Sequence, residues 1–366
     1  MKDYKRLGDY IREVNVRNRE LRVTKPMGIN IDKHFMPSVA NIIGTDLSAY
    51  KLVCKNQFAC NLMHVGRDEK IPIAMHTDKK PIIVSPAYFV FEIIPVETRC
   101  STSLHNNNEL LPEYLMMWFR RAEFDRNAWF YTDADVRGGM NKDVLLDMRL
   151  PIPTIARQRE IVSEYETLAC RIRLNEQMIA KLEETAQALY RKMFVEGVDK
   201  ENLPAGWRWG KIEEIAEIKN GKNILPVKGD VPVYGGNGIV GYTDQPNAKG
   251  IVVIGRVGVN CGSLFLHQGE CYVNDNAMMA IPKDRTLIYL YWSLKQIDLN
   301  SQSEGSSQPL LTQSIIYKQE CIIPNKTTRA AFDNQCQIIY KNIILLEQEN
   351  AKLTELQSLL LARMGK

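Results

Sequence analysis

The residues most able to do chemistry lie in glycine-bearing loops. The clearest pattern is the GxGxxG at residues 236–241, which in nucleotide-binding proteins follows a strand and opens a helix whose N-terminus faces phosphate. Here it is followed by YTDQPNAKG at residues 242–250, which is rich in turn-forming residues. The pattern therefore predicts a glycine-rich turn or hairpin and not a dinucleotide site.

Other catalytic motifs are missing from the sequence. There is no GxxxxGK[ST] phosphate loop and no Asn/Asp-Pro-Pro-aromatic tetrapeptide of the amino-methyltransferase kind. No Ser/His/Asp set or nuclease cluster has persuasive spacing. The eight cysteines form no CxxC pair, and the five histidines show no metal-ligand spacing. We expect reduced thiols, no bound metal and no catalytic centre.

The composition is that of an ordinary folded protein with two or three domains. The 366 residues are 45% apolar and 25% charged, and the net charge of +4 is compatible with a nucleic-acid partner without demanding one. The N-terminal MKDYKRLGDYIREV lacks the apolar core of a secretory signal. The longest apolar stretch, residues 82–96, is interrupted by Ser85, Pro86, Glu92 and Pro95. We expect a cytoplasmic protein.

One long helix is present twice. Residues 172–193 align without a gap on residues 343–364, at an offset of 171, with the EQ and AKL sequences at matching places. A fixed offset indicates two copies of one unit, each ending in a helix. Duplicated units tend to recognise a target with two related halves.

Both helices show the 3-4 apolar spacing of a narrow coiled-coil seam, rather than of a helix lying on a sheet. Each seam holds one asparagine, which either fixes the register or lies at a partly exposed position near the end of the packed seam. The predicted seam residues are Leu168, Ile172, Asn175, Ile179, Leu182 and Leu189, with Ile339, Ile343, Leu346, Asn350, Leu353 and Leu360.

Each half of the chain has the same predicted order of elements. Strand-rich stretches come first, then a compact helix that begins near Leu111 or Leu287, a polar glycine-bearing loop and a last short strand. We predict an α+β fold with domains at residues 1–153 and 198–324, and long helices at residues 154–197 and 325–366.

This organisation resembles the specificity subunit of type I restriction–modification enzymes over nearly the whole chain. The matching segments are LPAGWRWGKIEEIAEIKNGK (203–222), YGGNGIVGYTD (234–244), IP…RQREI (152–161) and the EQ…AKL repeat in both helices. One departure is IIPNKTTRAAF, which opens the second helix without the usual Glu-Gln.

The resemblance implies two target-recognition domains, each reading half of a bipartite DNA sequence, held apart by two antiparallel helices with pseudo-two-fold symmetry. It implies a non-catalytic protein whose partners are double-stranded DNA, two methyltransferase subunits and endonuclease/translocase subunits. S-adenosylmethionine, ATP and magnesium would then bind only to the partner subunits.

DNA reading needs Arg and Lys for phosphates and guanine edges, and Asn and Gln for adenine. Each candidate alone is typical of a solvated turn, but the set favours DNA. An alternative is a two-headed coiled-coil scaffold that binds protein or glycan ligands. The candidates are Asn61, His64, Arg67, Arg137, Gly138 and Asn141 in the first half, and Lys219, Lys222, Asn223, Tyr234, Asn237, Arg256, Ser303, Ser306, Ser307 and Gln308 in the second.

Overall fold

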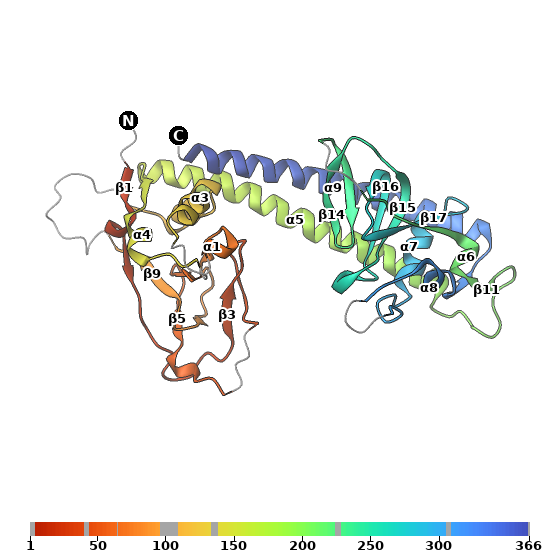
Figure 1. Cartoon of the computed structure of the whole chain (residues 1–366), viewed down its shortest axis with the longest axis horizontal. Helices are drawn as coiled ribbons and strands as arrows, with labels where there is room; N and C mark the ends of the chain where they lie inside the picture. Colours follow the sequence, from red (N-terminus) through yellow and green to blue (C-terminus); the bar gives the residue numbers. More distant parts are fainter. Residues whose placement is uncertain are drawn as a thin grey trace. The chain divides into compact units, whose positions relative to one another are not determined.

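The computed structural model describes residues 4–39, 44–63, 65–95, 109–132, 138–223, 228–304 and 309–364. It divides into two compact units, residues 1–174 with 349–366, and residues 175–348. Each unit contains both helices and strands (Figure 1), so the predicted α+β class is confirmed.

The described residues of the first unit form three small sheets, in the orders β1-β10, β2-β9-β6-β7 and β4-β3-β8-β5. The compact helix α2 lies inside its core, with residues 114–119 all buried, and Phe119 packs against Phe58 and Phe91. Its elements are β1 Tyr4–Arg6, η1 Leu7–Asp9, β2 Ile11–Glu13, β3 Pro26–Ile29, β4 Phe35–Pro37, η2 Leu47–Ala49, β5 Lys51–Val53, β6 Phe58–Cys60, α1 Val65–Asp68, β7 Ile73–Met75, β8 Ile82–Val84, β9 Phe89–Ile93, α2 Pro112–Phe119, α3 Ala122–Phe130, α4 Lys142–Asp147 and β10 Arg149–Pro151.

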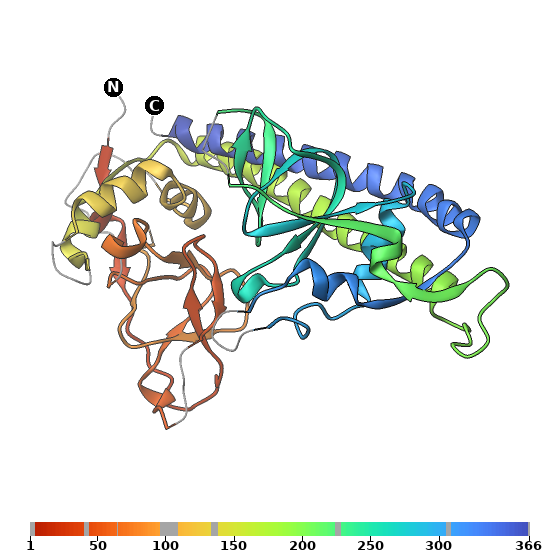
Figure 2. The ribbon, with the colours of Figure 1, turned by 45° about the vertical axis from the view of Figure 1, so that its right-hand side comes forward.

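The second unit is built on a six-stranded sheet in the order β12-β17-β15-β16-β13-β14, with a separate β11-β18 pair. The strands of the sheet run from green to cyan in Figure 2, and α7 is labelled in Figure 1. The elements are β11 Arg208–Lys211, α6 Ile212–Ile215, β12 Ala216–Asn220, β13 Val231–Gly235, β14 Gly238–Thr243, β15 Ala248–Gly255, η4 Gly258–Asn260, β16 Leu264–Val273, β17 Ala277–Pro282, α7 Leu287–Lys295, α8 Gln313–Tyr317 and β18 Glu320–Ile323.

The long helices α5 (Ile155–Phe194) and α9 (Lys326–Met364) each contribute to both units. In the first unit, Ile161 near the start of α5 shares a core with Leu360 near the end of α9. In the second unit, Ala186 of α5 shares a core with Phe332 near the start of α9. Within each unit the helices are therefore antiparallel, and both views show them side by side.

The two asparagines of the predicted seam differ in burial. Asn175 is fully buried, whereas Asn350 is half-buried. The structure also adds a contact that the seam prediction does not contain. The rings of Tyr190 and Phe194 pack against the ring of Tyr289 in α7, and their centroids lie 6.1 and 5.2 Å from the Tyr289 centroid. The helix thus packs against its domain through aromatic residues next to the seam.

A tyrosine ties each compact helix to the strand that precedes a long helix. Tyr114 Oη donates to the Pro151 carbonyl at 3.0 Å, and Tyr289 Oη donates to the Ile322 carbonyl at 2.6 Å. Both tyrosines are buried, and Pro151 and Ile322 are separated by the same 171 residues as the long helices. The duplication therefore extends from the helices into domains whose sequences have diverged.

A second tie is made by the first turn of each long helix. In the first unit Gln158 is fully buried, and its Nε2 donates to the Pro153 carbonyl at 2.9 Å. At the equivalent place in the second unit, Arg329 Nε donates to the Pro324 carbonyl at 3.1 Å. The departure seen in the sequence at the start of the second helix therefore keeps the backbone tie.

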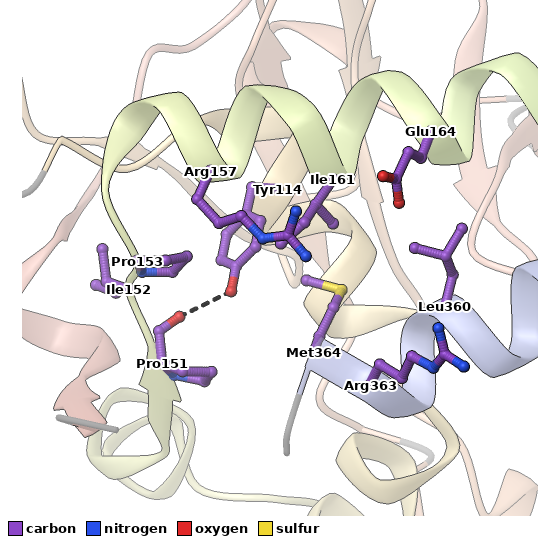
Figure 3. Close-up of a pocket in the computed structure, with 10 residues that line it drawn as sticks. All are labelled: Tyr114, Pro151, Ile152, Pro153, Arg157, Ile161, Glu164, Leu360, Arg363 and Met364. Carbon is purple, nitrogen blue, oxygen red and sulfur yellow. Dashed lines mark hydrogen bonds between the residues drawn. The ribbon is translucent and has the colours of Figure 1, made fainter. Parts of the chain in front are cut away.

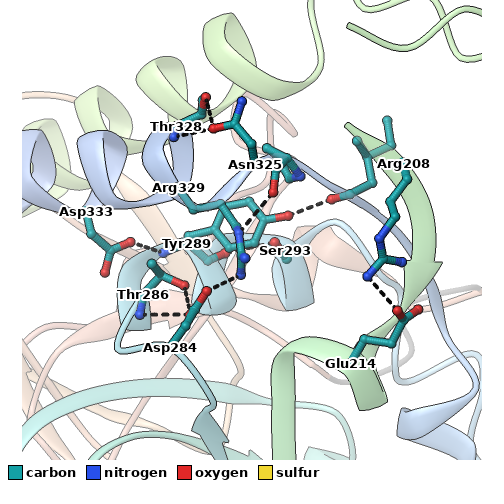
Figure 4. Close-up of polar contacts among 12 residues, drawn as sticks. Arg208, Glu214, Asp284, Thr286, Tyr289, Ser293, Asn325, Thr328, Arg329 and Asp333 are labelled. Atoms are coloured by element: carbon teal, nitrogen blue, oxygen red, sulfur yellow. Dashed lines mark hydrogen bonds and ion pairs between the residues drawn. The ribbon is translucent and has the colours of Figure 1, made fainter. Parts of the chain in front are cut away.

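Arg329, which stands where the first copy has Gln158, has further charged partners (Figure 4). Arg329 forms an ion pair with Asp284, and both side chains are largely shielded from water. Asp333, one turn further along α9, accepts the N–H groups of Ile288 and Tyr289 at 3.0 and 2.8 Å. These are otherwise unpaired donors in the first turn of α7, so the carboxylate caps that helix.

Burial raises the pKa of Asp333 to about 6, with Asp284 adding to the rise and the two backbone N–H groups opposing it. A carboxyl whose pKa is higher in the folded state binds more protons there than in the unfolded chain between pH 4 and 6. Its contribution to the free energy of unfolding is therefore greatest at low pH and is lost as the pH rises through about 6.

We expect the free energy of unfolding of Asp333→Asn to lack this pH-dependent decrease, because the asparagine side chain keeps one hydrogen-bond acceptor and cannot ionise. The free energy of unfolding of the wild type minus that of the variant should fall, by at most about 3 kcal/mol, from pH 4 to pH 7 and then level off. Urea titrations at several pH values, followed by tryptophan fluorescence, measure it. A difference that rises with pH would contradict the assignment.

Candidate functional site

In the second unit, polar loops meet around the β13–β14 turn. Gly236 lies in this turn, and its carbonyl accepts the Ser263 hydroxyl at 2.6 Å. A Cβ built on Gly236 would lie 3.2 Å from the Asn276 carbonyl oxygen, which also accepts the Arg256 N–H at 3.0 Å. The predicted hairpin is confirmed, because β14 follows the turn directly and no helix does. Gly238 has φ +90°, which favours glycine.

The segment after β12 joins the same group of loops. The Lys222 N–H donates to the Val273 carbonyl at 3.0 Å, and the Asn223 carbonyl accepts the Tyr272 hydroxyl at 3.0 Å. A Cβ on Gly221 would lie only 1.9 Å from the Asn274 carbonyl oxygen. Glycine is therefore needed at position 221 because one loop packs closely on another there. This packing explains the glycine without any contact to a phosphate.

A third loop closes on Arg256. The Arg256 carbonyl accepts the Leu311 N–H at 2.9 Å, and the Asn300 side chain donates to the Cys261 carbonyl at 2.8 Å. Ser303 is half-buried in this loop. We call residues 221–223, 236–238, 255–263, 274–276 and 300–304 the loop cluster of the second unit.

The loop cluster presents several of the predicted DNA contacts together. Lys222, Asn223 and Asn237 are exposed on it. Arg256 is half-buried, and its Nε has no hydrogen-bond partner among the residues that the structure describes. These side chains are the donors that phosphates and base edges accept. Ser306, Ser307 and Gln308 lie outside the described residues.

Two predicted contacts lie elsewhere. Tyr234 is buried against Phe265, and its hydroxyl pairs with His267 Nδ1 at 3.1 Å, so the structure gives it a place in the core rather than on a DNA-facing surface. Burial raises the pKa of Tyr234 to about 12, so it stays protonated. Lys219 is exposed on β12 and pairs with Glu217 at 3.1 Å.

In the first unit, residues 61–63 and 65–68 lie against residues 138–141. The Gly66 N–H donates to the Gly138 carbonyl at 2.7 Å, and a Cβ on Gly138 would lie 2.6 Å from Gly66 Cα. Gly138 therefore serves close packing, and its φ of +55° also favours glycine. The predicted residues Asn61 and Asn141 belong to these two segments, far apart in sequence.

Both asparagines have structural partners. The Asn61 side chain accepts the Met63 N–H at 3.0 Å, and exposed Asn141 accepts the Asp143 N–H at 2.9 Å as the N-cap of α4. His64 and Arg137 lie outside the described residues, and of Arg67 only the backbone, in α1, is described.

Sequence reasoning missed the turn at residues 274–276, which contacts both the Gly221 and Gly236 segments. Its Asn-Asp-Asn sequence between two apolar strands is a turn signal that could have been found. It also missed Val259, which is 91% exposed at the tip of η4.

Within the described ranges, no group of three His, Cys, Asp or Glu side chains could hold a metal ion. The seven cysteines found there are free thiols. None of the described helices combines the length and apolar character needed to cross a membrane.

Comparison with known proteins gives three findings. Residues 204–357 match the family model for the type I restriction modification DNA specificity domain. The type I restriction enzyme EcoprrI specificity subunit of Escherichia coli is 27% identical over 96 residues, which span 26% of this chain and 24% of that protein. The crystal structure of the type I restriction-modification system S subunit from M. genitalium shares the fold, with TM-score 0.60 and 14% identity over 100% of this chain and 96% of that one.

Proposed function

We propose that this protein selects the DNA target of a type I restriction–modification complex, because residues 204–357 match the family model for the type I restriction modification DNA specificity domain and the whole chain shares the fold of the M. genitalium S subunit. It is a reader without a catalytic centre, and it docks methyltransferase and endonuclease subunits. S-adenosylmethionine, ATP and magnesium belong to those partners.

The observation that carries the proposal is that each unit pairs the same frame with its own polar loops. The frames share the tyrosine tie and the pairing of strands β1 with β10 and β11 with β18. The loops differ: residues 61–63, 65–68 and 138–141 in the first unit, and the loop cluster in the second. Because similar frames carry different loops, the two units read two different half-sites of the DNA.

The two long helices, which contribute to both units, explain why the proposed DNA target has two parts. α5 and α9 each supply residues to both cores, and each runs as one continuous helix from the residues of one unit into those of the other. A regular helix rises about 1.5 Å per residue, which fixes a length. We propose that this length sets the gap between the half-sites, and that the repeated helix sequences offer similar surfaces to two identical methyltransferase subunits.

The loop cluster is tested by Lys222→Ala/Arg256→Ala. If both side chains contact phosphate, the slope of log affinity against log salt concentration should become shallower by about 1.8, or 0.9 for each contact. Binding of the chain with its methyltransferase to a duplex carrying the methylated site, titrated with NaCl, measures this slope.

Lys249→Ala is the matched control. Lys249 is exposed and lies at the start of β15, whereas Arg256 follows the end of that strand. Its removal should leave the slope unchanged. A double variant with the wild-type slope would exclude the loop cluster as the DNA surface, and no salt dependence in the wild type would favour the scaffold alternative.

A further inference from the structure

A groove in the first unit lies where the start of α5 meets the end of α9 (Figure 3). Its apolar lining comes from Tyr114, Ile152, Ile161, Leu360 and Met364, and its volume is about 330 Å³. A cavity of about 150 Å³ already admits benzene, so this groove has room for an aromatic ring.

The second unit contains the same site with a ring in it. By the common offset, Ile161 and Leu360 correspond to Phe332 and Leu189, while Tyr114 and Tyr289 make equivalent hydrogen bonds. There Phe194 is 4% exposed.

Phe194 packs against three other rings in that site. Its centroid lies 5.2 Å from Tyr289, 5.3 Å from Phe332 and 5.7 Å from Trp207. Tyr289 and Phe332 are the counterparts of two residues that line the groove of the first unit. The internal repeat therefore identifies what kind of group this site accepts.

The first copy has no such side chain at the matching place. The residue that corresponds to Phe194 is Gly365, and the groove lining among the described residues includes no aromatic ring besides Tyr114. The rim adds charge. Arg157 is paired with Glu160 and Glu164 adds one negative charge, whereas exposed Arg363 makes no ion pair within the described part of the chain.

We propose that this groove binds an aromatic side chain of a partner polypeptide, with a carboxylate beside it that meets Arg363. The ring occupies the place that Phe194 fills in the second unit, between Tyr114, Ile161 and Leu360. The groove is thus a protein-docking site and is distinct from the DNA-reading loops.

The test uses the full chain alone, so its failure leaves the proposed function untouched. The probes are acetyl-Glu-Phe-Gly-amide and the matched acetyl-Glu-Ala-Gly-amide at millimolar concentration, observed through ¹³C-labelled methionine methyl groups. We expect saturable shifts of the Met364 signal with the phenylalanine peptide. Binding of the alanine peptide should be roughly tenfold to a hundredfold weaker, because burying a phenylalanine ring contributes about 1.5–3 kcal/mol.

Two variants locate the site. Leu360→Trp should fill the groove and abolish the shifts, whereas Leu359→Trp, at a neighbouring position that is 52% exposed, should preserve them. If Leu360→Trp fails to fold, Arg363→Gln should weaken the Glu-Phe peptide roughly twofold to fivefold and leave a Gln-Phe peptide unaffected.

Equal binding of both peptides, or none, would overturn the proposal. Self-association of the peptide-free chain that Leu360→Trp abolishes would also overturn it, by assigning the groove to a second copy.

Discussion

Inserting seven residues into α5 alone is expected to reduce methylation of the native target at least about 100-fold, because one half-site can no longer be read in register with the other. The same insertion in both long helices is expected to restore methylation at a target with a longer gap. The insertion points are the boundaries between the units, after Leu174 in α5 and after Gln348 in α9.

The expectation follows from the repeat of the seam. Seven residues are two turns of a coiled coil, so a double insertion keeps the apolar positions on one face and adds about 10 Å of length. At about 3.4 Å per base pair this equals about three base pairs. A single insertion shifts one helix against the other, so the cores around Ile161 and Ala186 cannot both keep their partners on α9.

The control places the same seven residues between Asp199 and Lys200, in the exposed turn that follows α5. This variant should keep the native target. Sequencing of N6-methyladenine in cells carrying each variant gives the gap directly. A folded double-insertion variant that methylates sites with the original gap would refute the role of the helices as a spacer.

Replacing Asp125 by alanine is expected to lower the free energy of unfolding of the first unit by about 3–5 kcal/mol, because it leaves a buried ammonium without its partner. Lys33 is 4% exposed, and its Nζ donates to Asp125 Oδ1 and to the Phe119 carbonyl, both at 2.6 Å. Asp125 also accepts the Ile71 N–H at 3.2 Å. Burial lowers the pKa of Lys33, and Asp125 opposes that change.

The pair joins segments that are far apart in the sequence. Lys33 precedes β4, and Asp125 lies on α3. Arg12→Ala is the control, since Arg12 pairs with Glu92 at the surface and its removal should cost about 1 kcal/mol or less. Urea denaturation of the two variants measures the difference. An Asp125→Ala protein as stable as Arg12→Ala would show that the buried pair contributes little.

The features predicted correctly are those encoded by neighbouring residues. Seam spacing repeats every few residues, so the long helices follow from local sequence, and the glycines at 236 and 238 predict the hairpin. The tyrosine ties were not predictable in this way. Tyr289 and Ile322 are brought together only by the fold, as are Gly66 and Gly138.

Tyr234 lies on β13, just before the glycine-rich turn, and not in a loop as expected. Element boundaries are the least reliable part of a prediction from sequence, so a residue expected in a turn can belong to the strand before it. The ring packs with Val253 and Met279 on the interior face. By contrast, Lys222 and Asn237 are exposed in the loops predicted for them, because turn residues locate loops well even when their contacts depend on the fold.

If this chain selects a two-part DNA target for a methyltransferase, as we propose, the methylation pattern of the host genome depends on it. The most direct test is a map of N6-methyladenine across the host genome in three strains: wild type, a strain lacking this chain, and a strain carrying Lys222→Ala/Arg256→Ala. We expect one methylated motif of two short half-sites at a fixed gap, absent without the chain and reduced in the variant. A map that is unchanged when the chain is removed would contradict the proposal.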